Sequence, residues 1–184
     1  MSRLVVLSGP SAVGKGTIVA RLRELYPDVW VSISSTTRPP RSGEIDGVHY
    51  DFVTDDHFDQ LIESGEMLEW AHVHGANRYG TPRGPVEERL AAGGPCILEI
   101  DLQGALQVRE TMPEALLVFV EPPSWDELVR RLVGRGTEGE AERERRLETA
   151  RHEMAQRELF DLVIVNDDLD ACVRHLNSIL RDDR

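Results

Sequence analysis

The sequence predicts an α/β fold in which five parallel strands form a central sheet with helices on both faces. Short apolar runs alternate with amphipathic segments along the chain, a pattern typical of parallel strands connected by helices. A glycine-rich turn follows the first apolar run and leads into a helix pattern. The 184 residues, 40% of them hydrophobic, suffice for one sizeable core with small inserted subdomains, but not for two independent domains.

The five strands are predicted from short runs that are leucine-rich or β-branched. The first run, Leu4–Ser8, precedes the glycine-rich turn and a helix that extends to about Leu25. The others are residues 29–34, 96–100, 116–120 and 162–165. Each of the last three runs is followed by a polar residue and a helix pattern, so we expect helices to follow strands throughout the core.

The predicted helix boundaries agree with this order. Ser124, with Glu127 three residues later, has the spacing of a capping box at a helix start. Pro82 and Pro85 fit the first turn of a helix that stops before the paired glycines at 93 and 94.

Two stretches depart from the alternation. Between Arg41 and Thr81, strand patterns at 49–53, 67–74 and 78–81 surround one helix pattern at 55–64, which predicts a small mixed insertion. Further along, a glycine-bearing stretch at 134–139 leads into the charged segment 140–158. Its many Glu and Arg residues four positions apart predict a solvated helix.

The chain is acidic, which excludes one class of partner. Its 21 Lys and Arg against 33 Asp and Glu give a net charge of −12. Proteins that coat nucleic acid or anionic membranes through their overall charge are net basic. We therefore expect no nucleic acid and no membrane partner, and any phosphate-bearing ligand must be held by local positive charge.

Apolar runs and cysteines indicate the compartment. Only four strongly apolar residues, Leu4 to Leu7, precede the first polar turn, and the longest apolar run, 115–120, is too short to span a bilayer. Cys96 and Cys172 lie in strand-like and helix-like runs and are expected to be buried thiols. These features predict a cytoplasmic protein.

The glycine-rich turn has the residues and the context of a phosphate-binding P-loop, between a predicted strand and a predicted helix. Its glycines let backbone N–H groups and the helix N-terminus face a polyphosphate, and Lys15 adds a positive charge. The candidate residues are Gly9, Pro10, Ser11, Ala12, Val13, Gly14, Lys15, Gly16 and Thr17. The alternative is that the glycines only form a tight strand-to-helix turn.

The hydroxyl expected to bind Mg²⁺ is displaced by one position. The usual pattern has Ser or Thr directly after the lysine, whereas here Gly16 intervenes before Thr17. Either Thr17 acts through a water, or the metal is held mainly by the nucleotide. Asp101, at the end of a predicted strand, is a second candidate, because its carboxylate could orient water on Mg²⁺. It could equally cap the helix that follows.

A second candidate anion site follows the strand that ends near Ser34. Prolines 39 and 40 forbid continued helix or sheet, so Arg38 and Arg41 are displayed on a rigid, extended loop. Two guanidinium groups three residues apart, with hydroxyls beside them, suit a second phosphate group. Isolated arginines are more often solvated surface charges, but Tyr50, Glu69, Tyr79 and Thr81 follow in the same segment.

Six segments together resemble the guanylate kinase family, the ATP:GMP phosphotransferases among the P-loop nucleoside monophosphate kinases. They are residues 34–41, 69–70, 79–81, 101–104, 135–137 and 165–167, and the resemblance extends from Leu4 to about Leu180. It implies a single domain, residues 1–184, with a three-layer P-loop NTPase core, a mixed α/β GMP-binding insertion and a helical lid. The core would comprise 1–34, 82–133 and 159–184, the insertion 35–81 and the lid 134–158.

The resemblance also implies how GMP would be held. Arg38, Arg41, Tyr50 and Tyr79 would grip the GMP phosphate, while Ser34 and Thr81 would meet the guanine oxygen side. Glu69 and Asp101 would accept hydrogen bonds from the ring N–H and the exocyclic amine. The chemistry supports this independently, because guanine presents adjacent donors and a carboxylate only accepts. From spacing alone, Glu69 could also be an exposed strand charge.

Arginines near the predicted lid are implied to act on the phosphoryl group. Arg131 and Arg135 are four residues apart on one helix and project from the same face. With Arg146 they resemble the family's lid arginines, although Arg146 has Glu142 as a rival partner. Asn166 would contact adenine by the resemblance, and capping of the last helix is the alternative. The implied catalytic residues are Lys15, Arg38, Arg135 and Arg146.

The expected activity is transfer of the γ-phosphate of ATP to GMP, and to dGMP, with Mg²⁺ as cofactor. Two alternatives stay open at this point. A guanylate-kinase-like interaction module would bind phosphopeptides without catalysis, and a related kinase would use another nucleoside monophosphate. We expect a monomer or a small homo-oligomer.

Overall fold

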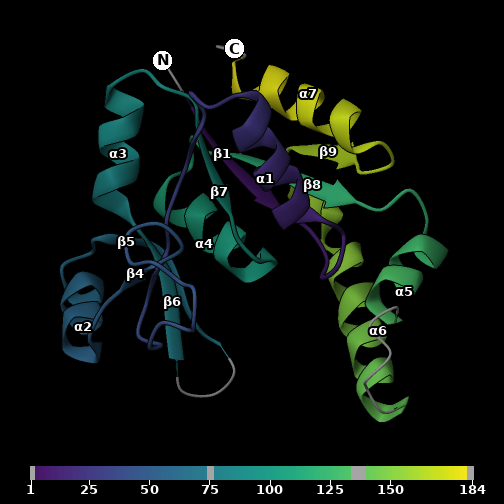
Figure 1. Cartoon of the computed structure of the whole chain (residues 1–184), viewed down its shortest axis with the longest axis horizontal. Coiled ribbons are helices and arrows are strands. Elements are labelled where there is room, and N and C mark those ends of the chain that lie inside the picture. Colours follow the sequence, from purple (N-terminus) through teal and green to yellow (C-terminus); the bar gives the residue numbers. More distant parts are fainter. Residues whose placement is uncertain (1–2, 74–76, 134–139, 182–184) are drawn as a thin grey trace.

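A five-stranded parallel sheet forms the centre of the molecule, as the sequence predicts (Figure 1). The structure is a computed structural model that describes residues 3–73, 77–133 and 140–181. The strands lie in the order β2 (Trp30–Val31), β7 (Cys96–Glu99), β1 (Leu4–Ser8), β8 (Leu116–Glu121) and β9 (Leu162–Val165). Every neighbouring pair is parallel, so all five carboxyl ends meet at one edge.

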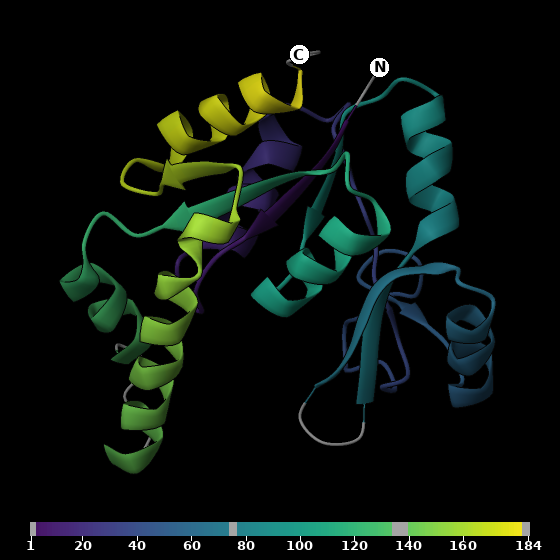
Figure 2. The same ribbon diagram turned by 180° about the vertical axis from the view of Figure 1, so that it is seen from behind.

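Helices cover both faces of this sheet. Because side chains alternate along a strand, Val5 and Leu7 face one layer while Leu4 and Val6 face the other. The first layer contains α1 (Lys15–Leu25) and α7 (Leu169–Leu180), and the second contains α3 (Arg83–Ala91) and α4 (Leu102–Thr111). Figures 1 and 2 show this three-layer arrangement from its two sides.

A second, four-stranded sheet lies beside the core. Its order is β4 (Asp51–Phe52), β3 (Ser35–Thr36), β6 (Asn77–Pro82) and β5 (Met67–Val73), and α2 (Asp55–Glu63) accompanies it. The predicted second strand at 29–34 is therefore too long. Beyond Val31, the Ser32 N–H still bonds to the carbonyl of Ile97, and the polar residues that follow leave the core to pair with β6.

The remaining helices extend from the core on the side away from the second sheet (Figures 1 and 2). They are α5 (Trp125–Val133) and α6 (Glu140–Ala155), followed by a short 3-10 turn (Arg157–Leu159). The Glu127 N–H donates to the Ser124 hydroxyl at 3.2 Å, which is one half of the predicted capping box. The predicted solvated helix is present over α6, where Ala150 alone of the described residues is fully buried.

Two further expectations concern thiols and membranes. Cys96 and Cys172 are both buried free thiols, as predicted. Within the described residues, no helix is both long and apolar enough to cross a membrane.

Candidate active site

Two cavities lie at the edge where the parallel strands end, which is where ligands bind in open α/β sheets. The first, the P-loop cavity, has a volume of about 540 Å³ and is lined by Ser11, Ala12, Gly14, Thr17, Arg131, Arg146, Asn166, Asp167 and Leu169. The second, the insertion cavity, has a volume of about 380 Å³ and is lined by Ser34, Arg41, Tyr50, Glu69, Ala71, Tyr79, Gly80, Glu99, Ile100 and Asp101.

The P-loop has backbone angles that explain the glycines of its sequence pattern. Gly9 and Gly14 have φ values of +149° and +101°, and Ala12 has a φ of +64°. A Cβ atom at Gly14 would lie 2.7 Å from the Asn166 amide nitrogen, so this position also allows a close approach. Positive φ values at three positions curve the loop before α1, and its Ser11 N–H already donates to a carboxylate oxygen of Glu153, as expected of a site suited to an anion.

Lys15 lies beneath this loop. Its ammonium donates to the carbonyl oxygens of Gly9 at 2.6 Å and Pro10 at 3.3 Å. Burial lowers the pKa of Lys15, and the negative charges of Glu99, Glu153 and Asp101 oppose that shift. Glu99 and Asp101 line the insertion cavity, so the positive charge of Lys15 interacts with two carboxylates of that cavity, although its own side chain is bonded to the P-loop.

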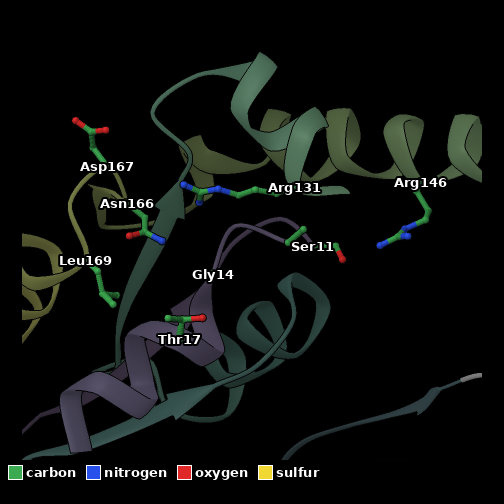
Figure 3. A pocket seen from close by; sticks show the side chains of 9 residues that line it. Ser11, Gly14, Thr17, Arg131, Arg146, Asn166, Asp167 and Leu169 are labelled. Atoms are coloured by element: carbon green, nitrogen blue, oxygen red, sulfur yellow. The ribbon is translucent and has the colours of Figure 1, made fainter. Parts of the chain in front are cut away.

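Arg131 and Asn166 converge on the outer side of the P-loop (Figure 3). The Asn166 amide and the Arg131 guanidinium donate to the same Val13 carbonyl, at 2.9 and 3.1 Å. Asn166 does not cap the last helix, because Asp168 does so by accepting from the Ala171 N–H at 2.7 Å. The alternative interpretation of Asn166 as a helix cap is therefore wrong, and its side chain lines the cavity instead.

The α6 helix contributes two residues to the same region. Arg146 lines the P-loop cavity, where its side chain extends from α6 on the side of Ser11 (Figure 3). The Ser11 N–H donates to the Glu153 carboxylate at 3.0 Å, so α6 is bonded to the P-loop itself. The predicted lid arginine Arg135 lies in the segment 134–139, which is outside the described residues. The side chain of Glu142, the predicted rival partner for Arg146, is not described either.

Arg38 is bonded on several sides within the second sheet. Its guanidinium forms a bidentate ion pair with Glu44 at 2.8 and 2.9 Å, and its Nε donates to the Tyr79 hydroxyl at 3.0 Å. It also lies 5.5 Å from the ring centre of Tyr50. Hydrogen bonds from Arg38 lower the pKa of Glu44 to about 2. Arg38 is only 8% exposed and is absent from the cavity lining, whereas Arg41 is exposed and lines the cavity.

Tyr79 connects this ion pair to the insertion cavity. Because its hydroxyl oxygen accepts from Arg38, the hydroxyl proton remains available for an acceptor such as a phosphate oxygen. Tyr50 lies edge-on to Tyr79, with ring centres 5.7 Å apart. Arg41, Tyr50 and Tyr79 therefore present one guanidinium and two phenols to the cavity, while Glu44 and Arg38 hold them from behind.

Glu69 and Asp101 approach each other at the far end of the cavity. A Cβ atom at Gly104 would lie 2.9 Å from a Glu69 oxygen and 3.3 Å from an Asp101 oxygen. Asp101 accepts from the Gly104 N–H at 2.7 Å, and Glu69 accepts from the Thr81 hydroxyl at 2.6 Å. Asp101 thus caps α4 and lines the cavity at once. Glu69 is only 8% exposed, so its interpretation as an exposed strand charge is wrong.

Burial changes the acid–base behaviour of Glu69. Loss of solvent is the main cause that raises the pKa of its carboxyl to about 7; the hydrogen bond from Thr81 opposes this shift, and the negative charge of Asp101 adds to it. The negative charge on Glu69 is therefore poorly compensated by the protein. A ligand that donates hydrogen bonds to this carboxylate would stabilise its ionised form.

The two residues proposed from sequence as metal ligands do not share a cavity. Thr17 lines the P-loop cavity, and Asp101 lines the insertion cavity. Among the described residues, no cluster of three or more His, Cys, Asp or Glu side chains is arranged to hold a metal ion. Glu99 lines the insertion cavity, and its negative charge is the largest of those that oppose the lowering of the Lys15 pKa.

Sequence reasoning missed Glu44 and Glu99. Glu44 lies in an irregular loop, so no periodicity or motif spacing connects it to Arg38. For Glu99 a weak signal exists, because a charged residue ends an apolar strand two positions before Asp101. Such a residue lies at the ligand-binding edge of the sheet by the same argument that singled out Asp101.

Comparison with known proteins agrees with this geometry. The guanylate kinase family model matches residues 1–183. A guanylate kinase of Streptomyces coelicolor is 61% identical over 174 residues, which cover 95% of this chain and 88% of that protein. One from Thermobifida fusca is 63% identical over 164 residues, covering 89% and 83%.

A solved structure gives the same result at the level of the fold. The crystal structure of guanylate kinase from Anaplasma phagocytophilum has a TM-score of 0.74 and 36% sequence identity, and the match covers 98% of this chain and 85% of that one. The resemblance deduced from six sequence segments is thus confirmed along the whole chain, which belongs to the guanylate kinase family.

Proposed function

We propose that this protein transfers the γ-phosphoryl group of ATP to GMP, giving ADP and GDP. The observation that carries the proposal is the pair of cavities at one sheet edge, with the buried ammonium of Lys15 on the P-loop interacting with carboxylates of the insertion cavity. One cavity is built around a P-loop, and the other combines an arginine and two phenols with three carboxylates. Two nucleotides bound there would meet through their phosphates.

The insertion cavity suits GMP at both of its ends. Arg41, Tyr50 and Tyr79 would bind the phosphate, with Arg38 supporting Tyr79. Glu69 and Asp101 would accept from the ring N–H and the exocyclic amine of guanine, and Ser34 and Thr81 would lie toward its carbonyl. Adenine offers no such pair of donors, so the buried Glu69 carboxylate would remain unpaired and AMP should be disfavoured by about 10⁴-fold. The same site should accept dGMP.

The P-loop cavity suits ATP. The nest formed by residues 9–14 and the start of α1 would hold the polyphosphate, and Gly16 and Thr17 extend it along the helix. Arg131 and Asn166, which share the Val13 carbonyl, would lie beside the nucleotide. Arg146 would reach the phosphoryl group from α6, and Arg135 is proposed to join it from the segment 134–139.

Catalysis would depend on positioning and on charge stabilisation. The attacking phosphate oxygen of GMP is already ionised near neutral pH, so no general base is needed. Lys15, Arg38, Arg135 and Arg146 are the proposed catalytic residues, of which Arg38 acts by orienting Tyr79 and by its charge. Closure of the segment 134–158 as a lid over the core would exclude water that could hydrolyse ATP.

Magnesium is the metal that the donor chemistry favours. Mg²⁺ in kinases is held by the phosphates and one or two protein oxygens, and it retains several waters. The hydroxyl of Thr17 on the P-loop side, or a carboxylate of Asp101 or Glu99 on the insertion side, would each provide one such oxygen, and phosphates and waters would complete the coordination. The metal would supply charge neutralisation between the phosphates. The cytoplasm, where ATP and GMP are available, is the proposed location.

A coupled assay of ADP formation tests the proposal. ATP with GMP should give rapid turnover, while AMP, UMP and dTMP should give rates close to the background. Binding of a phosphopeptide without any turnover of GMP would favour the interaction module instead. Equal rates with GMP and AMP would contradict the roles of Glu69 and Asp101.

A further inference from the structure

The strand that carries Glu69 is an edge strand of the second sheet. One side of β5 pairs with β6, and its other side faces α4, against which it packs. The α4 helix begins at its cap residue Asp101. The two carboxylates proposed to accept from guanine therefore belong to two elements, one in the second sheet and one in the core.

Side chains of α4 take the place of a neighbouring strand along β5. The Gln107 amide accepts from the Trp70 N–H at 3.1 Å and donates to the Trp70 carbonyl at 3.1 Å. One helical turn later, the Thr111 hydroxyl donates to the Leu68 carbonyl at 2.7 Å. The backbone on both sides of Glu69 is thus bonded to the helix that Asp101 caps.

Each of the two carboxylates is held by a further hydrogen bond, and the two lie close together. Glu69 is held by the Thr81 hydroxyl on the β6 side, and Asp101 is held by the Gly104 N–H. Gly104 allows the approach, because a Cβ atom there would lie 2.9 Å from a Glu69 oxygen. Within the described contacts of α4, Gln107 is the side chain that bonds the β5 backbone by both a donor and an acceptor.

We propose that Gln107 is a positioning residue that sets the spacing between Glu69 and Asp101, and through it the selection of guanine over bases with a single donor. The proposal rests on the proposed function. Gln107 acts through the backbone of β5 and touches no substrate. A base with two adjacent donors needs both carboxylates at a fixed spacing, whereas a base with one donor needs only one of them.

Inosine monophosphate provides the base with a single donor, since it keeps the ring N–H of guanine but lacks the exocyclic amine. If Gln107 sets the spacing, its loss should weaken GMP more than inosine monophosphate. A role in folding alone would affect both substrates, and ATP, alike. The ratio of kcat/KM for GMP to kcat/KM for inosine monophosphate is therefore the informative quantity.

The experiment compares the wild type with Gln107→Met and Thr111→Val. The first variant keeps the length of the side chain and removes both bonds to Trp70, and the second keeps the shape and removes the bond to Leu68. The matched control is Glu110→Gln, an exposed residue of the same helix. Steady-state kinetics with GMP, inosine monophosphate and ATP should accompany thermal melts of each protein.

For Gln107→Met we expect a KM for GMP raised about tenfold, since each net hydrogen bond contributes a modest factor, with the KM for ATP unchanged. The ratio of GMP to inosine monophosphate should fall by a similar factor, and Thr111→Val should shift it less, in the same direction. Glu110→Gln should match the wild type.

An unchanged ratio in folded Gln107→Met, or an equal loss toward GMP and ATP, would overturn the inference while leaving the kinase activity intact. If Gln107→Met does not fold, an unchanged ratio of kcat/KM for GMP to that for inosine monophosphate in Thr111→Val would overturn the inference instead. A wild type that does not phosphorylate GMP would overturn the proposed function, and this inference with it.

Discussion

The two cavities are both proposed to bind phosphate, but they are built from different parts of the chain. In the P-loop cavity the anion site consists mainly of backbone from residues 9–15, shaped by the left-handed φ values of Gly9, Ala12 and Gly14. In the insertion cavity it consists of the side chains of Arg41, Tyr50 and Tyr79. Arg38 and Glu44 support them from behind, and these residues come from separate strands and loops.

This difference matters for how each site tolerates change. A backbone site needs glycine at specified positions and one lysine, and neighbouring side chains can vary. A side-chain site depends on every member of its hydrogen-bond network, because a buried charge that loses its partner is costly. Substitutions at the P-loop should therefore act on turnover, while substitutions in the second sheet should act on the KM for GMP.

The largest effect is expected at Lys15. Lys15→Ala should lower kcat by roughly 10³-fold, because a positive charge near the transferring phosphoryl group is lost. The circular dichroism spectrum and the melting temperature should change little. Arg23→Ala, which removes a positive charge from an exposed position of the same helix, serves as the control. Turnover of Lys15→Ala near that of the control would refute the role.

The next largest effect is expected at Glu44. Glu44→Gln breaks the bidentate ion pair that holds Arg38 behind Tyr79. Hydrogen bonds to charged groups are the stronger kind, so the KM for GMP should rise between about tenfold and a hundredfold, with a smaller change in kcat. The KM for ATP should stay constant.

Glu87→Gln is the matched control for this prediction, since Glu87 forms a more exposed ion pair with Arg83. A double-mutant comparison tests whether Glu44 acts through Arg38. If Glu44 acts through Arg38, adding Glu44→Gln to Arg38→Met should cause no further loss. Full additivity of the two substitutions would show that Glu44 acts elsewhere.

A pH dependence of about tenfold is expected from Glu69. Its pKa of about 7 in the protein is raised mainly by burial. Protonation removes an acceptor for guanine, so the KM for GMP should be highest near pH 6 and fall toward a plateau near pH 8. Across those two units the ionised fraction rises about tenfold. Glu69→Gln, which does not ionise, should lose this component and isolates it from titration of the GMP phosphate itself.

The raised pKa of Glu69 also predicts how the stability of the protein changes with pH. A carboxyl whose pKa is raised on folding binds its proton more tightly in the folded protein than in the unfolded chain. The free energy of unfolding of the unliganded protein should therefore decrease as the pH rises from about 4.5 to about 7, and Glu69→Gln should reduce this slope. A steeper slope in the variant would contradict the assignment.

The smallest effect is expected at Asn166. Asn166→Ala removes one bond to the Val13 carbonyl, which Arg131 also contacts. Because the second donor remains, the KM for ATP should rise only a few-fold, with the KM for GMP unchanged. A raised KM for GMP with an unchanged KM for ATP would contradict the assignment of Asn166 to the ATP site.

The sequence predicted the P-loop side well because that side is local. Leu4–Ser8, the turn and the helix are consecutive, so motif and periodicity describe strand, loop and helix together. The five parallel strands were also predictable, apart from the end of the second one. There the polar run after Val31 leaves the core to pair with β6, and no local rule shows which sheet a short polar strand joins.

The insertion side was predicted mainly through family resemblance. The pairing of Glu44 with Arg38 crosses an irregular loop, and the bonds of Gln107 to Trp70 connect a helix of the core with a strand 37 residues earlier. Such contacts have no fixed spacing in sequence. The burial of Glu69 likewise depends on how β5 packs on α4, which only the assembled fold determines.

The central claim is that donor and acceptor nucleotides meet end to end at the edge of the sheet where both cavities lie. A crystal structure with GMP and a non-hydrolysable ATP analogue tests it most directly. We expect guanine against Glu69 and Asp101, the analogue on the P-loop, and the γ-phosphorus within about 3.5 Å of a GMP phosphate oxygen. A complex in which the GMP phosphate points away from Lys15, with both sites occupied, would contradict the claim.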